Sequence, residues 1–259
     1  MRRALIACIH GNLVAIEAVL KDIALESVDE IVCLGDMVGF GPDVIECVDL
    51  VRERCAWSLC GDYDARLFMS TPTDLNHTFQ KSLLRERKVL EPGWSSGLRA
   101  RARWKWLEKL EPRKTDRDAL FVHGSCRDPL MEFLSSEDFD LTLGASIKSR
   151  EVFEFAESVC FGAHSHRPGV VPQGKEWQRP ETLDNSRATL DPSVKYIVNV
   201  GSVGQPRDRD ARSCYVVWDD EERTVTFHRV PYDLVATKKR FDRVPELGAR
   251  CFDRLVSGV

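Results

Sequence analysis

The sequence predicts an α/β fold built around a parallel sheet. Short apolar runs alternate with stretches of helical periodicity, and each apolar run is followed closely by glycine and polar residues. Such alternation is typical of βαβ units, whose strands are parallel. The composition is that of an ordinary globular protein, with 43% hydrophobic and 30% charged residues in 259. We expect a single domain spanning residues 1–259.

The N-terminal elements alternate most clearly. The expected order is a strand at Ala4–Cys8, a helix from Leu13, a strand at Glu30–Leu34, a helix at Pro42–Arg54 and a strand at Ala56–Leu59. Asn12 is a suitable N-cap for the first helix. The polar residues after each strand should meet at the carboxyl edge of the sheet, where open α/β sheets bind ligands.

The rest of the chain continues the mixture. The middle, from Ala65 to Leu110, has helical patterning, and the polar stretch Gln173–Pro192 is expected to form a surface excursion. Further strands are expected at Ala119–Val122, Val159–Phe161, Tyr196–Val200, Ser213–Trp218 and Thr224–Val230, with helices at Ile147–Ser158 and from Tyr232 onward.

The basic stretch Leu98–Leu110 has two interpretations. Its arginines and lysines beside Trp104 and Trp106 would suit nucleic acid, with cations on phosphates and rings stacked on bases. Alternatively it is a solvated helix whose tryptophans pack on the core. The formal net charge is −4, which gives no global attraction to nucleic acid or an anionic membrane. We favour the solvated helix and do not expect nucleic acid as a partner.

Cysteine usage and hydropathy indicate a cytoplasmic protein. The nine cysteines are odd in number and scattered from Cys8 to Cys251, without CxxC pairs. This distribution favours reduced thiols. No apolar run approaches the roughly 18 residues of a membrane helix. The apolar segment near the N-terminus ends before His10, which makes it too short for the hydrophobic region of a secretory signal peptide.

A metal site is the chemistry that the polar residues predict. A single histidine at a strand end is usually a capping or core residue, but here four histidines and three aspartates occupy such turns. They are His10, Asp36, Asp62, Asp64, His123, His164 and His166. Imidazole suits borderline transition metals, and carboxylates can bridge two of them.

The motifs resemble those of the calcineurin-like metallophosphoesterases, and most closely the bacterial branch described as diadenosine tetraphosphatase-like or protein-phosphatase-like. Asp-x-His-Gly-Asn appears as Cys8-Ile9-His10-Gly11-Asn12, and Gly-Asp-x-x-Gly as Gly35-Asp36-Met37-Val38-Gly39. The other matching segments are Gly61-Asp62-Tyr63-Asp64, Val122-His123-Gly124-Ser125, Ala163-His164-Ser165-His166-Arg167-Pro168 and 199–208. The resemblance implies a four-layer α/β/β/α sandwich.

The resemblance also implies a ligand set for one or two divalent transition metals such as Mn, Fe or Zn. One metal would take Cys8, His10, Asp36 and His166, and the other would take Asp36, Asp62, His123 and His164, with Asp36 bridging. Tyr63 stands where the family has a histidine near the leaving group, and Asp64 beside it would be its orienting partner.

Three positions depart from the family pattern. Cys8 replaces an aspartate, so a hard oxygen ligand is lost; a thiolate suits Zn or Fe better than Mn or Mg. The alternative is a buried thiol with the first metal weakened or lost. Asp62 replaces asparagine and keeps an oxygen ligand. Tyr63 carries a hydroxyl, which with a pKa near 10 is a weak proton donor at neutral pH. Arg207 could reach a phosphate or form a surface salt bridge.

Two functions of different classes follow. The first is a metal-dependent phosphoesterase that hydrolyses a phosphomonoester or phosphodiester of a small substrate such as a nucleotide, at a rate attenuated by Cys8 and Tyr63. The second is a catalytically silent relative that acts as a binding or regulatory module, and a variant gated by oxidation of Cys8 comes third. Because five family ligands are unchanged, we favour the enzyme. The sequence leaves the substrate and the oligomeric state open.

Overall fold

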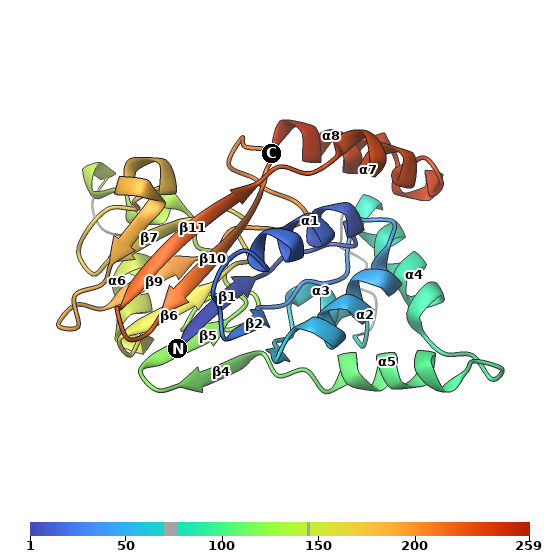
Figure 1. Ribbon diagram of the computed structural model, residues 1–259, viewed down its shortest axis with the longest axis horizontal. Coiled ribbons are helices and arrows are strands. Elements are labelled where there is room, and N and C mark those ends of the chain that lie inside the picture. The colour runs from blue at the N-terminus through green and yellow to red at the C-terminus, as the bar shows by residue number, and fades with distance from the viewer. Residues whose placement is uncertain (70–76, 144–145) are drawn as a thin grey trace.

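Two mixed β-sheets form the centre of the computed structural model, which describes residues 1–69, 77–143 and 146–259 (Figure 1). The first sheet has the strand order β3 (Trp57–Ser58), β2 (Glu30–Cys33), β1 (Arg2–Ile6), β10 (Ser213–Asp219), β11 (Thr224–Val230), β8 (Arg187–Thr189). The second has the order β4 (Arg113–Asp116), β5 (Ala119–Val122), β6 (Val159–Gly162), β9 (Tyr196–Asn199), β7 (Gly169–Pro172).

Eight α-helices lie in the described part of the chain. They are α1 (Leu13–Ile23), α2 (Val44–Arg54), α3 (Asp62–Arg66), α4 (His77–Leu90), α5 (Leu98–Glu108), α6 (Ile147–Phe155), α7 (Leu234–Phe241) and α8 (Ala249–Ser257). Asn12 caps α1 as the sequence predicts, because its side-chain oxygen accepts a hydrogen bond from Ala15 N at 3.2 Å.

Three hydrophobic cores separate the layers. The central core lies between the sheets and contains Phe121 and Phe161 from the second sheet and Trp218 from the first, all fully buried. An outer core joins the first sheet to α1, α2 and the C-terminal helices. A third core packs α6 against the other side of the second sheet through Val152 and Phe153. The order is therefore α/β/β/α, which confirms the expected four-layer sandwich.

The sheets are mixed, whereas the sequence predicts a parallel one. β3, β2 and β1 are parallel neighbours, but β10 pairs antiparallel with β1, as does β11 with β10. β5, β6 and β9 are parallel, and the edge strands β4 and β7 run antiparallel to them. The edge strands β4, β7 and β8 are not predicted. β4 and β8 are mostly exposed and lack an apolar run, and β8 lies within the expected surface excursion.

The basic helix α5 packs as a surface helix. Trp104 and Trp106 are partly buried against the outer core. Arg103 is buried and donates two hydrogen bonds to Asp49, at 2.8 and 2.6 Å. These contacts support the solvated-helix interpretation. Residues 70–76 of the stretch expected to be helical lie outside the described residues.

Two further observations bear on the compartment. The nine cysteines are all free, and eight of them are buried. Among the described helices, none is long and apolar enough to cross a membrane.

Candidate metal centre

The seven expected ligands lie together where strands of both sheets end. The loop after β1 carries Cys8 and His10, and the loop after β2 carries Asp36. Asp62 begins α3, after the short loop that follows β3. From the second sheet, His123 follows β5, and His164 and His166 follow β6. Within each sheet, the loops that follow parallel neighbouring strands lie at the same edge, where the strands have their carboxyl ends. The stacking of the sheets brings these two edges together.

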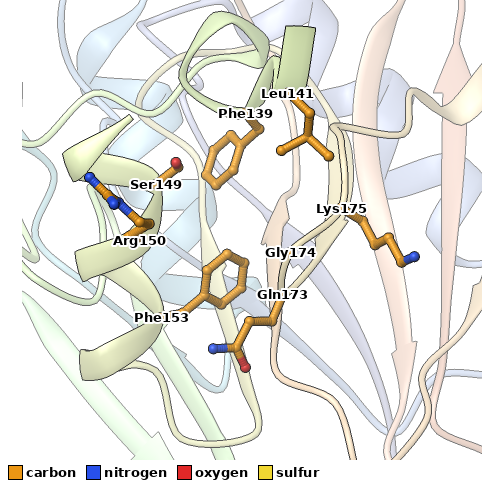
Figure 2. Close-up of a pocket in the computed structure, with 8 residues that line it drawn as sticks. All are labelled: Phe139, Leu141, Ser149, Arg150, Phe153, Gln173, Gly174 and Lys175. Atoms are coloured by element: carbon orange, nitrogen blue, oxygen red, sulfur yellow. The ribbon is translucent and has the colours of Figure 1, made fainter. Parts of the chain in front are cut away.

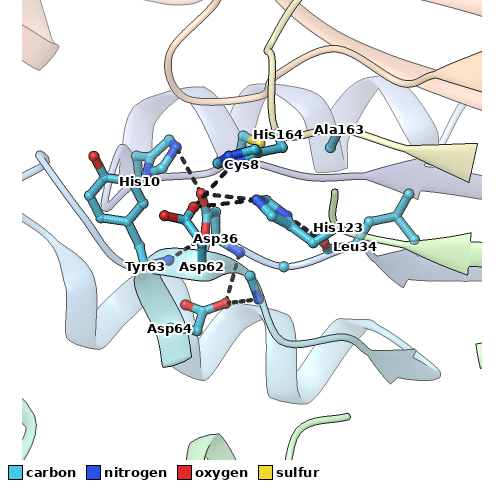
Figure 3. A network of polar contacts seen from close by, with 12 residues as sticks. Cys8, His10, Leu34, Asp36, Asp62, Tyr63, Asp64, His123, Ala163 and His164 are labelled. Atoms are coloured by element: carbon cyan, nitrogen blue, oxygen red, sulfur yellow. Dashed lines mark hydrogen bonds and ion pairs between the residues drawn. The ribbon is translucent and has the colours of Figure 1, made fainter. Parts of the chain in front are cut away.

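The side chains form two groups of potential ligands that share one carboxylate. Cys8, His10, Asp36 and His166 make one group, and Asp36, Asp62, His123 and His164 make the other; the ligand atoms of each group lie within 4.8 Å of one another. Figure 3 shows most of these side chains gathered around Asp36. The structure thus brings together every metal ligand that the resemblance implies, in the implied groups.

Asp36 lies at the junction of the two groups. Its Oδ2 is 3.5 Å from His10 Nε2 and 3.3 Å from His123 Nε2. In the second group, Asp62 Oδ1 lies 3.6 Å from His123 Nε2 and 3.3 Å from His164 Nδ1. The other Asp36 oxygen, Oδ1, accepts a hydrogen bond from Tyr63 N at 2.9 Å. This bond fixes the carboxylate and leaves Oδ2 directed into the centre.

Several ligand residues have a backbone conformation that costs free energy. Cys8, His10, Asp36 and His166 have φ values of 52°, 49°, 57° and 58°, all in the left-handed region. Each such residue other than glycine costs on the order of 1 kcal/mol or more. Strain of this kind persists only where the surrounding structure enforces it, and it gathers at functional sites.

Backbone carbonyls orient three of the imidazoles. His10 Nδ1 lies 2.9 Å from Val38 O, His123 Nδ1 lies 2.8 Å from Leu34 O, and His166 Nδ1 lies 2.5 Å from Gln205 O. Since a carbonyl only accepts, each Nδ1 carries a proton, and the opposite Nε2 of the neutral ring presents a lone pair. Histidines that bind metals usually donate their other ring N–H to a carbonyl, a carboxylate or a water in this way.

The buried polar atoms without partners test whether a metal fits. Asp36 Oδ2, Asp62 Oδ1, His123 Nε2 and His164 Nδ1 are buried and have no hydrogen-bond partner among the described residues. Burial of such groups is costly unless something compensates for the lost water. All four are donor atoms suited to a divalent transition metal. The four atoms are those of the second group, whose residues therefore fit one such ion.

The electrostatics of the centre differ between its histidines: burial lowers the pKa of His10 and His166, whereas the Asp36 and Asp62 carboxylates outweigh burial and raise the pKa of His123 well above its usual value. Burial lowers the pKa of His10 to about 3, so the ring is neutral, as metal ligation requires. Burial also raises the pKa of Asp36 to about 6, an effect that the nearby His123 opposes. A bound cation would favour the ionised carboxylate.

Cys8 is fully buried within the first group. Burial, and after it the charge of Asp36, raises the pKa of its thiol well above the usual value. Its backbone is tied on both sides: Cys8 N donates to Gly35 O at 2.9 Å, and Cys8 O accepts from Ser202 Oγ at 2.9 Å. The backbone of Cys8 is thus held in place, and its sulfur lies among the potential ligands of the first group.

Tyr63 packs beside the first group. Its ring lies edge-on to His10 at 5.1 Å and against Phe40 at 4.8 Å between centroids. Burial raises the pKa of Tyr63 well above its usual value of 10, so its hydroxyl stays protonated at neutral pH.

Asp64 lies beneath the loop that carries Asp36, as Figure 3 shows. Its Oδ2 accepts from Asp36 N at 2.7 Å and from Gly61 N at 3.0 Å, and its Oδ1 accepts from Met37 N at 3.1 Å and Val38 N at 3.2 Å. Four backbone donors thus converge on one buried carboxylate. Asp64 positions the metal centre through the backbone of residues 36–38.

Arg207 is half-buried, and its charge acts on the nearby Cys8 and Tyr63. It donates to Gln205 Oε1 at 2.7 Å, and its Nε is buried without a hydrogen-bond partner in the described part of the chain. No carboxylate of the described residues forms an ion pair with it. Within the described residues, the structure therefore does not support the interpretation of Arg207 as a member of a surface salt bridge.

Comparison with known proteins decides the family. The family model of the calcineurin-like phosphoesterase superfamily domain matches residues 1–223. The chain belongs to this superfamily. A curated relative from Methanocaldococcus jannaschii, "Uncharacterized protein MJ0912", is 30% identical in an alignment of 258 residues, and the match covers 96% of each chain.

Solved structures of similar proteins share the superfamily fold. A metallophosphoesterase from Sphaerobacter thermophilus is 32% identical, with a TM-score of 0.82, and the match covers 100% of this chain and 99% of the other. A hypothetical protein from Pyrococcus horikoshii OT3, PH1004, is 20% identical with a TM-score of 0.73 and covers 100% and 98%. The resemblance seen in the motifs is thus confirmed. Members of the superfamily bind divalent metals, and the two ligand groups are the candidate site for them.

Sequence reasoning missed the residues that orient the ligands. The carbonyls of Leu34, Val38 and Gln205 act through the backbone, so their residue type carries no signal. For Gln205 the only hint is its place within the 199–208 motif.

A cavity elsewhere contains none of the superfamily ligands. It has a volume of about 230 Å³ and lies between α6 and the turn after β7 (Figure 2). Phe139 and Phe153 face it from one side, and Gln173 and Lys175 line it from the other. The residues suited to phosphoester chemistry lie instead at the strand ends.

Proposed function

We propose that this protein is a metal-dependent phosphoesterase that hydrolyses a phosphomonoester or phosphodiester of a small substrate, such as a nucleotide. Water adds to phosphorus, the ester P–O bond breaks, and the alcohol leaves with a proton. The observation that carries this proposal is the pair of buried four-residue groups sharing Asp36, since a shared carboxylate is the usual way to hold two metals close together.

The metal ions would be Mn, Fe or Zn. Two divalent metal ions at such a centre polarise phosphate oxygens and lower the pKa of the attacking water. One metal would be held by the first group, Cys8, His10, Asp36 and His166, and the other by the second group, Asp36, Asp62, His123 and His164. The sulfur of Cys8 favours Zn or Fe in the first group, whereas the oxygen and nitrogen donors of the second accept any of the three.

Tyr63 and Arg207 would bind the substrate. The protonated hydroxyl of Tyr63 can donate a hydrogen bond to the phosphate or the leaving oxygen, but it cannot exchange its proton readily at neutral pH. The Arg207 guanidinium supplies a positive charge beside the centre, and guanidinium–phosphate bonds are among the stronger hydrogen bonds in proteins. The free cysteines support a reducing compartment, and we propose the cytoplasm.

The test is hydrolysis of p-nitrophenyl phosphate and bis(p-nitrophenyl) phosphate by the purified protein with added Mn²⁺ or Zn²⁺. Wild-type protein should release p-nitrophenol from at least one of them, and Asp36→Asn should lower the rate at least a hundredfold because both groups share Asp36. Asp184→Asn removes a charge from an exposed carboxylate and should leave the rate unchanged.

Two results would contradict the proposal. Activity that survives Asp36→Asn would indicate a contaminant or a different site. Absence of activity from a broad panel of monoesters, diesters and nucleotides, in protein shown to contain metal, would favour the binding-module alternative.

A further inference from the structure

The loop between α4 and α5 carries the two most exposed large apolar side chains in the described part of the chain. Trp94 is 99% exposed, and Leu98, the first residue of α5, is 87% exposed. In Figure 1 this loop projects from the body of the molecule, at the end of α5 that lies farther from the sheets. Tryptophan supplies a large apolar area and is enriched at protein interfaces, so this position is suited to contact with a partner.

The loop that presents Trp94 is held in one conformation by a single side chain. Arg101 Nε donates to Ser96 O at 3.1 Å, and Arg101 Nη2 donates to Gly93 O at 3.0 Å and to Trp94 O at 2.8 Å. Ser96 N donates to Gly93 O at 3.2 Å. A loop that is ordered before it binds loses less conformational entropy on docking, which favours association.

A groove of about 450 Å³ lies beside this loop, between α1, α2 and α5. Its apolar part comes from three side chains that are buried or half-buried: Leu13, Ile45 and Leu50. Arg99, which directly follows Leu98, also lines the groove. Trp94 comes five residues before Arg99, so their Cα atoms lie at most about 18 Å apart. The loop and the groove therefore adjoin on one surface, and the groove has room for an indole ring.

The groove carries an excess of negative charge. Its rim has three exposed glutamates without an ion pair to the described residues: Glu17, Glu46 and Glu53. The two arginines that line it, Arg99 and Arg103, both pair with Asp49, at 3.1 and 2.6 Å. The unpaired glutamates thus determine which charge the groove attracts.

The loop side carries the opposite charge. Arg101 and Lys105 are exposed on α5, and neither forms an ion pair with a carboxylate of the described residues. An apolar tip flanked by cations therefore adjoins an apolar groove rimmed by anions. Complementary charge of this kind guides association and fixes the orientation of the partners.

We propose that this surface is the interface of a symmetric dimer, in which Trp94 of each copy enters the groove of the other. A twofold axis requires a patch that is complementary to itself, and the adjoining loop and groove provide both halves of such a patch. The partner is therefore a second copy of this chain. The inference uses neither the metal centre nor the proposed function.

The test is sedimentation velocity from about 1 to about 200 µM, a range in which weak dimers dissociate. Wild-type protein should dimerise, and Trp94→Ala should raise the dissociation constant at least tenfold, since a buried tryptophan often dominates the binding energy of an interface. Leu25→Ala is the matched control, because Leu25 is 85% exposed in the turn after α1 and belongs to neither the loop nor the groove. It should leave the dissociation constant unchanged.

The charge of the rim is tested by Glu46→Lys, which should raise the dissociation constant about tenfold because it places a cation opposite the cations of the loop. Added salt should weaken the wild-type dimer. Glu157→Lys reverses the charge of an exposed residue beyond the end of α6 and should dimerise as the wild type does.

A crosslink tests the location of the contact. Trp94→p-benzoylphenylalanine should crosslink on irradiation to α2 of another chain. Mass spectrometry of a mixture of unlabelled and isotope-labelled protein identifies both the segment and the chain.

Three results would overturn the inference: wild type that stays monomeric over the whole concentration range, Trp94→Ala that dimerises as tightly as wild type, or a crosslink outside the groove. Monomeric wild type that binds vesicles containing phosphatidylglycerol, and loses this binding in Trp94→Ala, would also overturn it, since the loop would then dock on a membrane.

Discussion

The Nε2 atoms of His10 and His166 face each other at 3.2 Å, with the two rings stacked at 4.9 Å. The Nδ1–H of each ring donates a hydrogen bond to a backbone carbonyl, so both facing Nε2 atoms carry lone pairs when the rings are neutral. Burial lowers the pKa of His10 to about 3 and that of His166 well below its usual value, which disfavours a shared proton. The arrangement is repulsive without a cation, and this is a physical argument for a metal that does not depend on the family.

The first prediction concerns metal content. Purified protein prepared without chelators should contain at least one transition metal, and His123→Ala should lower the content by half or more because it removes a ligand of the second group. His228→Ala is the matched control, since His228 lies outside both groups and stacks on Tyr215 at 4.6 Å. Elemental analysis of each protein measures the outcome, and metal-free wild type would contradict the prediction.

Cys8 provides the second prediction. Because the Cys8 sulfur lies in the first group, Cys8→Ala should remove about one metal per chain. Cys8→Asp should retain both metals but shift the preference from Zn toward Mn, because a hard carboxylate replaces a soft thiolate. Competition between Zn²⁺ and Mn²⁺, followed by elemental analysis, measures this shift. If Cys8→Ala keeps the wild-type metal content, the thiol is not a ligand.

The fold and the ligand set could be predicted because they depend on local patterns. Alternating apolar runs mark β1, β2, β5 and β6, and each ligand follows one of these strands or β3 within a few residues. The antiparallel strand β10 could not be placed, since its pairing with β1 joins residues more than 200 positions apart. Register and sheet order of this kind depend on tertiary packing, which local periodicity does not encode.

The roles of individual site residues were harder to predict. The sequence suggests Asp64 as a partner of Tyr63 because the two are adjacent, yet adjacent residues on a helix do not face the same way. In the structure Asp64 points away from the ring and binds the backbone of the Asp36 loop.

Asp64 carries the third prediction. Asp64→Asn replaces one acceptor oxygen by an NH₂ group, which then faces backbone N–H donors that it cannot satisfy. The free energy of unfolding should fall by about 3 kcal/mol, since buried unpaired polar groups cost roughly 1–3 kcal/mol each. Urea denaturation measures the change, with Asp253→Asn on the surface of α8 as the control. A loss below about 0.5 kcal/mol, the range of ordinary surface substitutions, would show that the four hydrogen bonds are not needed.

The last prediction concerns Glu86, a fully buried residue of α4 that supports the loop beside the metal centre. Ser82 Oγ donates to Glu86 at 2.6 Å and accepts from Phe40 N at 2.9 Å. Burial raises the pKa of Glu86 from 4.5 to about 8. Below pH 4.5 both the folded and the unfolded chain hold the proton, so the contribution of the neutral acid to stability is complete. Between pH 4.5 and 8 Glu86 ionises only in the unfolded chain, and the free energy of unfolding should fall by up to about 1.4 kcal/mol per pH unit.

The Glu86→Gln side chain is uncharged at every pH and should remove this slope, so that the variant is the more stable protein at pH 8. Urea denaturation from pH 5 to 8.5 in EDTA, with exposed Glu91→Gln as the control, measures it. Parallel stability curves for wild type and Glu86→Gln would show that Glu86 is ionised in the folded protein throughout this range.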